Sequence, residues 1–166
     1  MDVSERPESY VFKGPALRRL TAEQFVDAVS GVTGVWQTKV QGTFDFSLVS
    51  AHATPAPMRV RAALVAADPL MTALGRPNRE QVVTTRASAA TTLQLLELQN
   101  GATLATELHR GAQRLVAGGQ TGAQLVDTIF LRALGRKPTG AERSLALSTV
   151  GAKPSVAGTE DLLWSI

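Results

Sequence analysis

The sequence predicts an all-α fold: an irregular multi-helix bundle with a long loop and at most one short extended segment. Apolar residues make up 44% of the 166 residues, but aromatic residues make up only 5%. A core of that composition is built mainly from Leu, Val and Ala, which favour packed helices. Helix-start motifs recur along the chain, and apolar residues follow each of them at helical spacing. The length suits one domain with an irregular arm.

Residues 1–20 are expected to form an extended N-terminal arm, because prolines and a glycine interrupt them and no helical period is sustained. Three apolar side chains are expected to hold this arm against the body: Tyr10, Phe12 and Leu17. Residues 21–166 are expected to form a single helical domain. Its last helix follows a loop over 152–158, begins near Thr159 and shows no helix end, so we expect a domain truncated at its C-terminal helix.

Three capping boxes mark helix starts. In each box a Thr hydroxyl accepts a hydrogen bond from the backbone amide three residues later, while the Gln or Glu at that position reaches back to the cap. The boxes begin at Thr21, Thr121 and Thr139. They predict helices over about 21–32, from 121 to a stop at Gly135, and from 139 to Gly151. The last two helices form a predicted helix-turn-helix.

The strongest helical signal runs from Thr91 to Val116. Leucines form a wide apolar stripe over this segment: Leu93, Leu95, Leu96, Leu98, Leu104, Leu108 and Leu115. So wide a stripe predicts a central, heavily buried element. Asn100-Gly101 interrupts the segment, and Gly costs about 1 kcal/mol relative to Ala inside a helix. We therefore expect two helices that meet at a bend.

The remaining segments carry weaker patterns. Residues 35–57 are expected to form a loop with one short extended segment, since apolar and polar residues alternate over 44–48. Residues 59–67 have a helical composition, and we expect a helix there that ends near Asp68-Pro69. One more helical turn is expected over 70–74.

The composition excludes several kinds of site. The chain has no cysteine, which removes disulfides, thiolate metal ligands, thiol nucleophiles and covalent haem attachment, and we expect no cofactor. The formal net charge is +3 and the pI is about 9.8, but Lys and Arg are scattered in small groups and form no polybasic tail. No run approaches the roughly 20 apolar residues that cross a bilayer, so no membrane-spanning segment is expected.

The densest polar cluster lies between residues 76 and 86. Paired guanidinium groups can hold a sulfate, phosphate or carboxylate, so the cluster is a candidate site for an anionic small molecule or a polysaccharide. The favoured alternative is an Arg–Glu network that pins an irregular segment onto the helix beginning near Thr91. The speculative ligand-binding residues are Arg76, Arg79, Glu80, Arg86, Gln94 and Asn100.

Catalytic and metal-binding residues are not expected. His52 and His109 are the only histidines and lack ligand spacing. No Gly-x-Ser-x-Gly elbow occurs, and no spacing makes two carboxylates converge. Nucleic acid is not favoured as a partner, because Glu142 and Arg143 are the only charged residues in the candidate recognition helix, 140–149.

Three stretches, in this order, carry a resemblance to a known family: residues 19–28, residues 74–84 with the run Arg76-Pro77-Asn78-Arg79-Glu80, and residues 92–100 with Thr92-Leu93-Gln94. The sequence resembles domain of unknown function 1553, which is typical of planctomycetes and related bacteria. Residues 130–142 also fit the closing helix pair of that family, so the resemblance covers most of residues 18–166.

One departure concerns the C-terminal residues, where a family helix would continue beyond Ile166. Leu162, Leu163 and Trp164 could present an apolar surface to a partner, but truncation of the helix explains the same exposure more simply.

The resemblance implies a larger multidomain parent protein, often exported to the periplasm or cell surface, with this domain at its C-terminal end and a cytochrome-c-like domain upstream. Haem binding and redox chemistry would belong to that separate domain. The expected partners are therefore the other domains of the same parent. The resemblance supplies no biochemical function, and the residues themselves do not fix the compartment.

We expect this chain to be a non-catalytic helical module of a larger bacterial protein. One alternative is an anionic-ligand or polysaccharide-binding part of a composite enzyme site centred on Arg76, Arg79 and Arg86. A second alternative is a helix-turn-helix DNA-binding protein. No enzymatic activity is expected of the chain itself, whereas the question stays open for its full-length parent.

Overall fold

The computed structural model describes residues 18–36, 59–77 and 90–166. Over these ranges it confirms the all-α prediction, since the regular elements are helices and no strand occurs among them. The predicted extended segment within 35–57 lies outside the described residues. The elements are α1 (Ala22–Thr33), the 3-10 turn η3 (Ala62–Leu64), α2 (Pro69–Ala73), α3 (Thr92–Asn100), α4 (Ala102–Ala117), α5 (Gly122–Leu134), α6 (Gly140–Val150) and α7 (Val156–Ser165).

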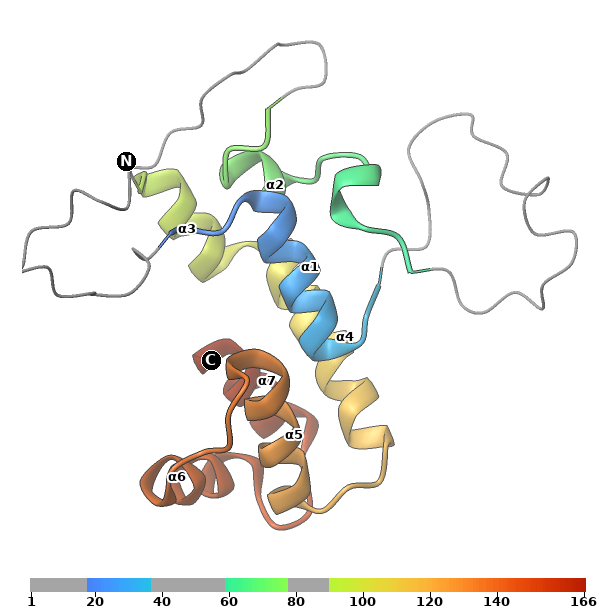
Figure 1. Cartoon of the computed structure of the whole chain (residues 1–166), viewed down its shortest axis with the longest axis vertical. Helices are drawn as coiled ribbons and strands as arrows, with labels where there is room; N and C mark the ends of the chain where they lie inside the picture. The colour runs from blue at the N-terminus through green and yellow to red at the C-terminus, as the bar shows by residue number, and fades with distance from the viewer. Residues whose placement is uncertain (1–17, 37–58, 78–89) are drawn as a thin grey trace, which may run out of the picture.

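Helix α4 is the central element of the bundle. In Figure 1, α1, α2 and α3 gather at one end of the molecule and α5, α6 and α7 at the other, and α4 runs from one group to the other. Its main neighbours are α7 and α1, and it also touches α2 and α3. Both groups of helices therefore share one core along α4.

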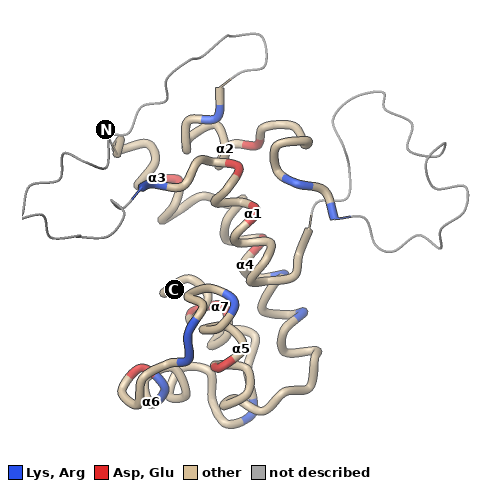
Figure 2. The backbone as a smooth tube through the Cα atoms, viewed as in Figure 1, with Lys and Arg blue, Asp and Glu red and all other residues tan. Residues whose placement is uncertain are grey.

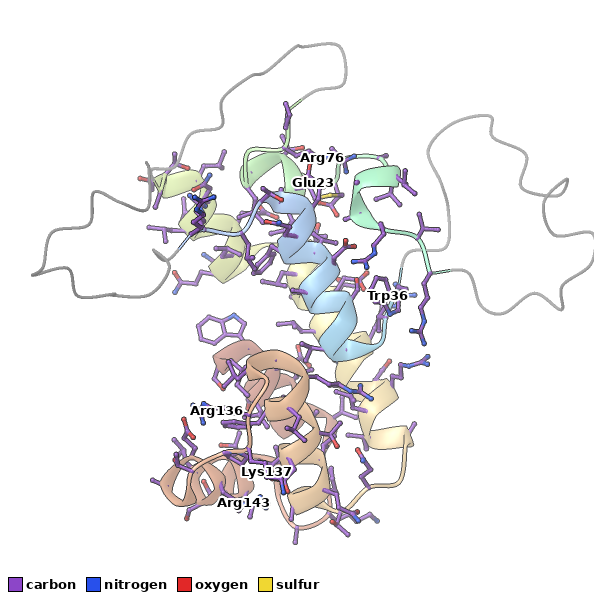
Figure 3. All side chains as sticks on the ribbon, in the orientation of Figure 1. Glu23, Trp36, Arg76, Arg136, Lys137 and Arg143 are labelled. Carbon is purple, nitrogen blue, oxygen red and sulfur yellow. The ribbon has the colours of Figure 1, made fainter. Side chains whose placement is uncertain are left out.

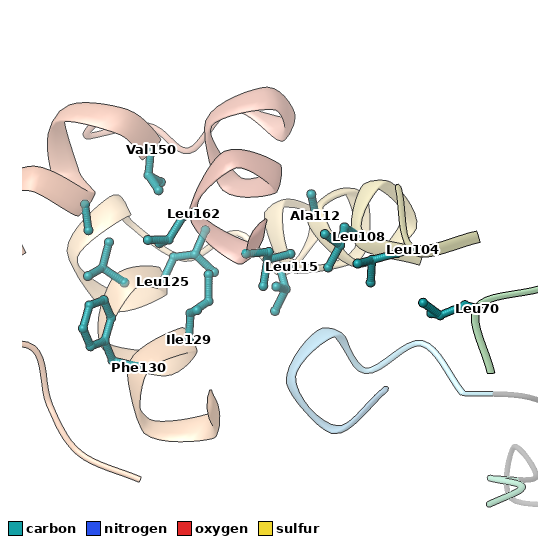
Figure 4. Close-up of a cluster of buried hydrophobic side chains, with 13 residues drawn as sticks. Leu70, Leu104, Leu108, Ala112, Leu115, Leu125, Ile129, Phe130, Val150 and Leu162 are labelled. Carbon is teal, nitrogen blue, oxygen red and sulfur yellow. The ribbon is translucent and has the colours of Figure 1, made fainter. Parts of the chain in front are cut away.

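The main core is continuous through both groups. One buried face of α4 supplies Leu104, Leu108, Ala112 and Leu115. Figure 4 shows the cluster extending from Phe130 of α5 at one side to Leu70 of α2 at the other. A second, smaller cluster beneath α1, η3 and α2 consists of Ala22, Val60, Ala62, Val65 and Met71. Leu, Val, Ile and Ala dominate both clusters, in line with the low aromatic content.

The predicted capping boxes are confirmed at the starts of α1, α5 and α6. A fourth box, not predicted from the sequence, opens α3: Thr91 accepts from the Gln94 amide, and the Gln94 side chain accepts from the Thr91 amide. The signal was present, because Thr91-Thr92-Leu93-Gln94 has the required spacing.

The predicted division at Asn100-Gly101 is also confirmed, because α3 ends at Asn100 and α4 begins at Ala102. The prediction of heavy burial is correct for α4 and wrong for α3. Leu93 and Leu96 of α3 are 63% and 54% exposed, and Gln94 is the one residue of that helix classed as buried. The bend separates the two helices, and α3 has α2 as its main neighbour, so little of its wide apolar stripe finds a partner among the described residues.

Two helix boundaries were predicted wrongly. Residues 59–67 form only the short turn η3, and Asp68-Pro69 starts α2 instead of ending a helix. Asp68 is the N-cap, its carboxylate accepts from the Met71 amide at 2.7 Å, and Pro69 occupies the first turn, where its missing N–H costs nothing.

Helix α7 begins three residues earlier than predicted, at Val156, because Ser155 and not Thr159 is its N-cap. The sequence did not predict a helix start at Val156, because Gly158 follows it and glycine is a poor helix former. The glycine is required there by packing: a Cβ atom at this position would lie 2.1 Å from the Thr149 carbonyl oxygen of α6.

The crossing of α1 and α4 depends on a glycine. A Cβ atom at Gly111 of α4 would lie 2.5 Å from Cβ of Thr33, the last residue of α1. Thr33 is 1% exposed, and its hydroxyl donates to the Val29 carbonyl at 2.8 Å, so its side chain is fixed in place. The two backbones can approach this closely only because residue 111 lacks a side chain.

Gly111→Ala is therefore expected to push α1 away from α4 and to lower the free energy of unfolding by about 1–3 kcal/mol through overpacking. Gly31→Ala is the matched control, because Gly31 also lies in a helix but has open space around its Cβ position. That control should stabilise the protein by up to about 1 kcal/mol through helix propensity. Urea unfolding of both variants measures the contrast, and equal effects would refute the role of the close approach.

Candidate functional site

Arg76, the first residue of the predicted ligand cluster, is used to join elements of the fold. Its side chain is 8% exposed, and its guanidinium donates to the carbonyl oxygens of Ala62 at 2.9 Å and Ala63 at 3.2 Å. Its Nε lies 3.8 Å from a carboxylate oxygen of Glu23 in α1, and Figure 3 shows the two side chains together. Arg76 thus connects α1, η3 and the end of α2.

The other predicted ligand residues described in the structure do not join Arg76. Gln94 is buried, closes the α3 capping box and accepts from Nη2 of Arg19 at 2.6 Å, whereas Arg76 donates to Ala62 and Ala63. Asn100 is exposed at the last position of α3. Arg79, Glu80 and Arg86 lie outside the described residues, so the cluster as a whole remains a prediction.

The helix-turn-helix predicted from the sequence is formed by α5 and α6, and its charged side chains bond to one another. Arg143 of α6 is paired with Asp127 of α5. Arg136 makes a two-pronged hydrogen bond to Glu142, with N–O distances of 2.8 Å and 2.7 Å. Figure 2 shows Lys and Arg interspersed with Asp and Glu over the described helices. The two charged residues of the candidate recognition helix are therefore committed to intramolecular pairs.

The Arg136 pair has an electrostatic consequence. The hydrogen bond from Arg136, together with those from the amide and hydroxyl of Thr139, lowers the pKa of Glu142 from 4.5 to about 2. The same hydrogen bond to Glu142 raises the pKa of Arg136. Both groups are exposed, so Glu142 is not a buried reactive carboxylate. The pair instead determines how the start of α6 responds to acid.

Both ring nitrogens of His109 in α4 have hydrogen-bond partners. Its Nδ1 lies 2.8 Å from a carboxylate oxygen of Glu160, and its Nε2 lies 3.0 Å from the amide nitrogen of Gln113. Because the amide donates and the carboxylate accepts, the neutral ring is held with its proton on Nδ1. Among the described residues no group of three or more His, Asp or Glu side chains is arranged to hold a metal ion. His52 lies outside them.

An aromatic and basic cluster lies where the chain leaves α1. The guanidinium groups of Arg59 and Arg61 each lie 6.0 Å from the ring centre of Trp36. Asp27 of α1 binds Arg61 at 3.2 Å and accepts from the Ala62 amide at 2.9 Å. These contacts hold the segment before η3 against α1. Asp27 thus links α1 to η3.

An apolar groove of about 660 Å³ lies between α1, α3, α4 and the C-terminal end of α7. Thr33 and Gln99 are the only polar residues in its lining, and no charged residue lines it. Several large apolar side chains remain more than half exposed at its edge: Leu20, Leu95 and Trp164. We refer to this hollow as the groove.

The groove forms because several helices pack on α4. Helices α1 and α7 both pack on α4, and α3 leaves it at the Gly101 bend, so the space between them is floored by Leu104 and Leu108 and walled by the three other helices. Among the described residues that line the groove, none has a side chain that titrates. Its chemistry is that of a surface which excludes water from another apolar group.

A smaller hollow of about 150 Å³ adjoins the groove and shares Leu98 and Trp164 with it. Glu160 and Asp161 line this hollow and are its only charged residues. One margin of the groove is therefore acidic.

The groove was not predicted from the sequence, although two signals pointed to it. The leucines of α3 are distributed around more of the helix than α4 and α2 can cover, and exposed Trp164 had been noted as a surface for a partner. Its neighbours Leu162 and Leu163 are buried in the core. What the sequence could not give was the juxtaposition of residues 20, 95 and 164, because it depends on helix packing angles.

None of the described helices combines the length and apolar character needed to cross a membrane.

Comparison with known proteins gives one finding. The family model described as PSD1, protein of unknown function (DUF1553), matches residues 2–150. No curated protein and no solved structure matches the chain.

Replacing Arg76 tests its part in joining the elements. Arg76→Met should lower the free energy of unfolding by about 2–4 kcal/mol, because two carbonyl groups and Glu23 lose a nearly buried donor. Arg110→Met makes the same chemical change in a guanidinium that is 61% exposed and paired with Glu107, and it should cost less than about 1 kcal/mol. Equal losses in urea unfolding would contradict the structural role.

Glu142 should make stability depend on acid in a defined window. Because its pKa is lowered from 4.5 to about 2 on folding, its stabilising effect is complete above about pH 4.5 and disappears as the pH falls toward 2. Glu142→Gln keeps a capping box of the kind that Gln24 and Gln124 already form. The difference in urea midpoint between the native chain and this variant should shrink between pH 4.5 and 2, and a constant difference would exclude this effect.

Proposed function

The chain belongs to the DUF1553 family of proteins of unknown function, and on that premise we propose that it is a non-catalytic packing module of a larger protein. The groove binds an apolar segment of the same parent polypeptide that lies outside the helical body. The module thereby fixes the position of the chain, or of the domain attached to it, against α4. Its activity is recognition and not turnover.

The observation that supports this proposal is the lining of the groove. A water-exposed apolar surface of this size is unfavourable unless another apolar group covers it. Several described charged side chains are engaged in pairs that hold elements together, as in Arg76 with Glu23 and Arg143 with Asp127. The chemistry offered to a partner is therefore apolar contact.

The alternative centred on Arg76, Arg79 and Arg86 has less support. Arg76 would have to release two carbonyl groups and Glu23 before it could hold an anion. The DNA-binding alternative has less support as well, because Glu142 and Arg143 are already paired. We retain the packing module as the proposed function.

We also propose that the parent protein is exported, and that any redox chemistry belongs to a separate domain. This proposal rests on the resemblance to planctomycete-type proteins alone. Fractionation of cells that express the full-length parent would test it, since recovery in the cytoplasm would contradict export.

The proposed function predicts that apolar ligands bind in the groove. Leu95→Asp and Leu93→Asp form a matched pair, because both residues lie in α3 and are 60% and 63% exposed, but only Leu95 lines the groove. The probe is 8-anilinonaphthalene-1-sulfonate, titrated against each variant. Leu95→Asp should weaken its binding about tenfold, the loss expected when one large apolar contact of about 1.4 kcal/mol is removed.

Leu93→Asp adds the same charge to the same helix and should change the affinity for the probe by less than about twofold. If both variants weaken the binding equally, the probe responds to charge or to partial unfolding, and the groove is not the binding surface. Circular dichroism of each variant shows whether the helices have been retained.

A further inference from the structure

We propose that the surface at the C-terminal end of α1 binds a ligand that carries at least two sulfate or phosphate groups. Guanidinium groups from three other segments converge on residues 32–36, where the chain leaves α1: Arg59, Arg61, Arg114 and Arg132. We refer to this surface as the arginine surface. It goes beyond the proposed function, because the lining of the groove includes none of these four arginines. All four belong to the described residues, whereas residues 1–17 of the predicted N-terminal arm lie outside them.

Two of the four arginines reach the end of α1 from helices that pack beside it. Arg132 of α5 donates to the Val32 carbonyl at 3.2 Å. Arg114 of α4 lies against the backbone two residues further along, since a Cβ atom on Gly34 would be 3.0 Å from its Nε. Residue 34 is a glycine with a φ of 74°, and the absence of a side chain there lets the Arg114 guanidinium lie this close.

The other two arginines precede η3 and lie beside Trp36. The guanidinium groups of Arg59 and Arg61 are each 6.0 Å from the centre of the Trp36 ring, a distance at which cation–π attraction still operates. Figure 3 shows Trp36 beside α1. Because the ring restricts both side chains, a ligand that binds them has less side-chain freedom to remove.

Carboxylates compensate only part of this charge. Asp27 pairs with Arg61 at 3.2 Å, and the Arg61 side chain is still 69% exposed. Within the described ranges, no ion pair compensates Arg59, Arg114 or Arg132. All three are exposed. Their mutual repulsion is therefore unfavourable until an anion neutralises it.

The end of the helix accounts for only one of these arginines. Cations near a helix C-terminus commonly donate to its last carbonyl groups, and Arg132 does so at Val32. Arg59 and Arg114 make no hydrogen bond in the part of the chain that the structure describes. The N–H donors of these two guanidinium groups therefore remain available to a ligand.

The geometry favours sulfate or phosphate groups, and more than one of them. A guanidinium donates paired hydrogen bonds that match the oxygens of such groups. Val32 and Trp36 are four residues apart, so the two ends of the surface are separated by up to roughly 14 Å. One tetrahedral anion accepts only from donors within about 3 Å of its oxygens, whereas a ligand with two such groups can contact both ends. A sulfated carbohydrate and a phosphorylated compound both supply this chemistry.

Isothermal titration calorimetry at low ionic strength tests the proposal with two probes, sucrose octasulfate and inorganic tripolyphosphate. At least one of them should bind the native chain, and the tighter one identifies the source of the anionic groups. Arg59→Gln/Arg114→Gln should weaken this binding about tenfold, because two charge-assisted contacts are lost. Circular dichroism shows whether the helices of the variant have been retained.

Lys137→Gln/Lys153→Gln is the matched control, since it removes the same net charge from exposed residues outside the arginine surface. It should change the affinity for the probes by less than about twofold. Equal weakening in the two double variants would mean that the probes respond to the net charge of the chain, and the inference would be wrong. Failure of both probes to bind the native chain would contradict it as well.

Quenching by iodide locates the bound probe. The chain contains two tryptophans, so Trp164→Phe leaves Trp36 as the only one, and Trp36→Phe leaves Trp164. The arginines should attract iodide to Trp36, and a bound anionic probe should reduce this quenching about twofold. Quenching of Trp164, which lines the groove, should stay the same. An equal effect on both tryptophans would exclude binding at the arginine surface.

The arginine surface and the groove can fail separately. The contrast between Leu95→Asp and Leu93→Asp in binding 8-anilinonaphthalene-1-sulfonate tests the groove, and neither residue belongs to the arginine surface. Loss of that contrast would overturn the proposed function and leave the binding of sulfate or phosphate groups to be decided by the arginine variants.

Discussion

The close crossing of α1 on α4 at Gly111 and Thr33 is the constraint on which the arrangement of the other helices depends. It places α1 along one side of α4, while α7 packs on the same helix and α5 contacts α1 as well. Arg132 of α5 extends this arrangement by donating to the Val32 carbonyl at the end of α1, at 3.2 Å. A side chain at residue 111 would separate these helices and alter the core and the groove together, because both are bounded by α1 and α4.

The polar side chains of the described region serve mainly to join one element to the next. Arg76 connects α1 to η3, Arg143 connects α6 to α5, and His109 connects α4 to α7. No buried side-chain nitrogen or oxygen in the described ranges lacks a hydrogen-bond partner. Catalytic groups in active sites commonly have perturbed pKa values in a cleft, whereas the shifted pair here, Arg136 and Glu142, is exposed and closes a helix start. Among the described residues, these polar groups thus hold elements of the fold together.

The sequence predicted those features whose causes lie within a few residues of one another. The starts of α1, α5 and α6 followed from Thr and Gln or Glu three residues apart, and the bend at Gly101 followed from a single glycine. The start of α7 was predicted wrongly because Gly158 is unfavourable in a helix, and the contact that requires it comes from Thr149, outside the local pattern. Local propensity cannot report such a constraint.

The exposure of α3 is a second feature that local sequence patterns could not predict. Its leucines predicted a buried helix, since a wide apolar stripe normally faces a core. The stripe is real, but its burial depends on which elements lie opposite, and α2 is the main neighbour. The groove was missed for this reason, as its walls come from residues 20–33, 95–99 and 163–166. Of the predicted site residues, Arg76 and Gln94 both bond to partners within the fold, but Arg76 joins α1 and η3 and not the helix that begins near Thr91.

Helix α7 lies beyond the residues that the family model matches, although it forms one wall of the groove. The match ends at residue 150, the last residue of α6, yet α7 follows directly and contributes Leu162 and Leu163 to the main core. Gly158 lets α7 lie against the Thr149 carbonyl of α6, and Glu160 binds His109 of α4. Helix α7 is therefore an integral part of the helical body. The floor of the groove and its α1 and α3 walls lie within the matched residues, whereas the wall with Trp164 lies beyond them. Variation in that wall would change which apolar segment fits while the floor on α4 stays the same.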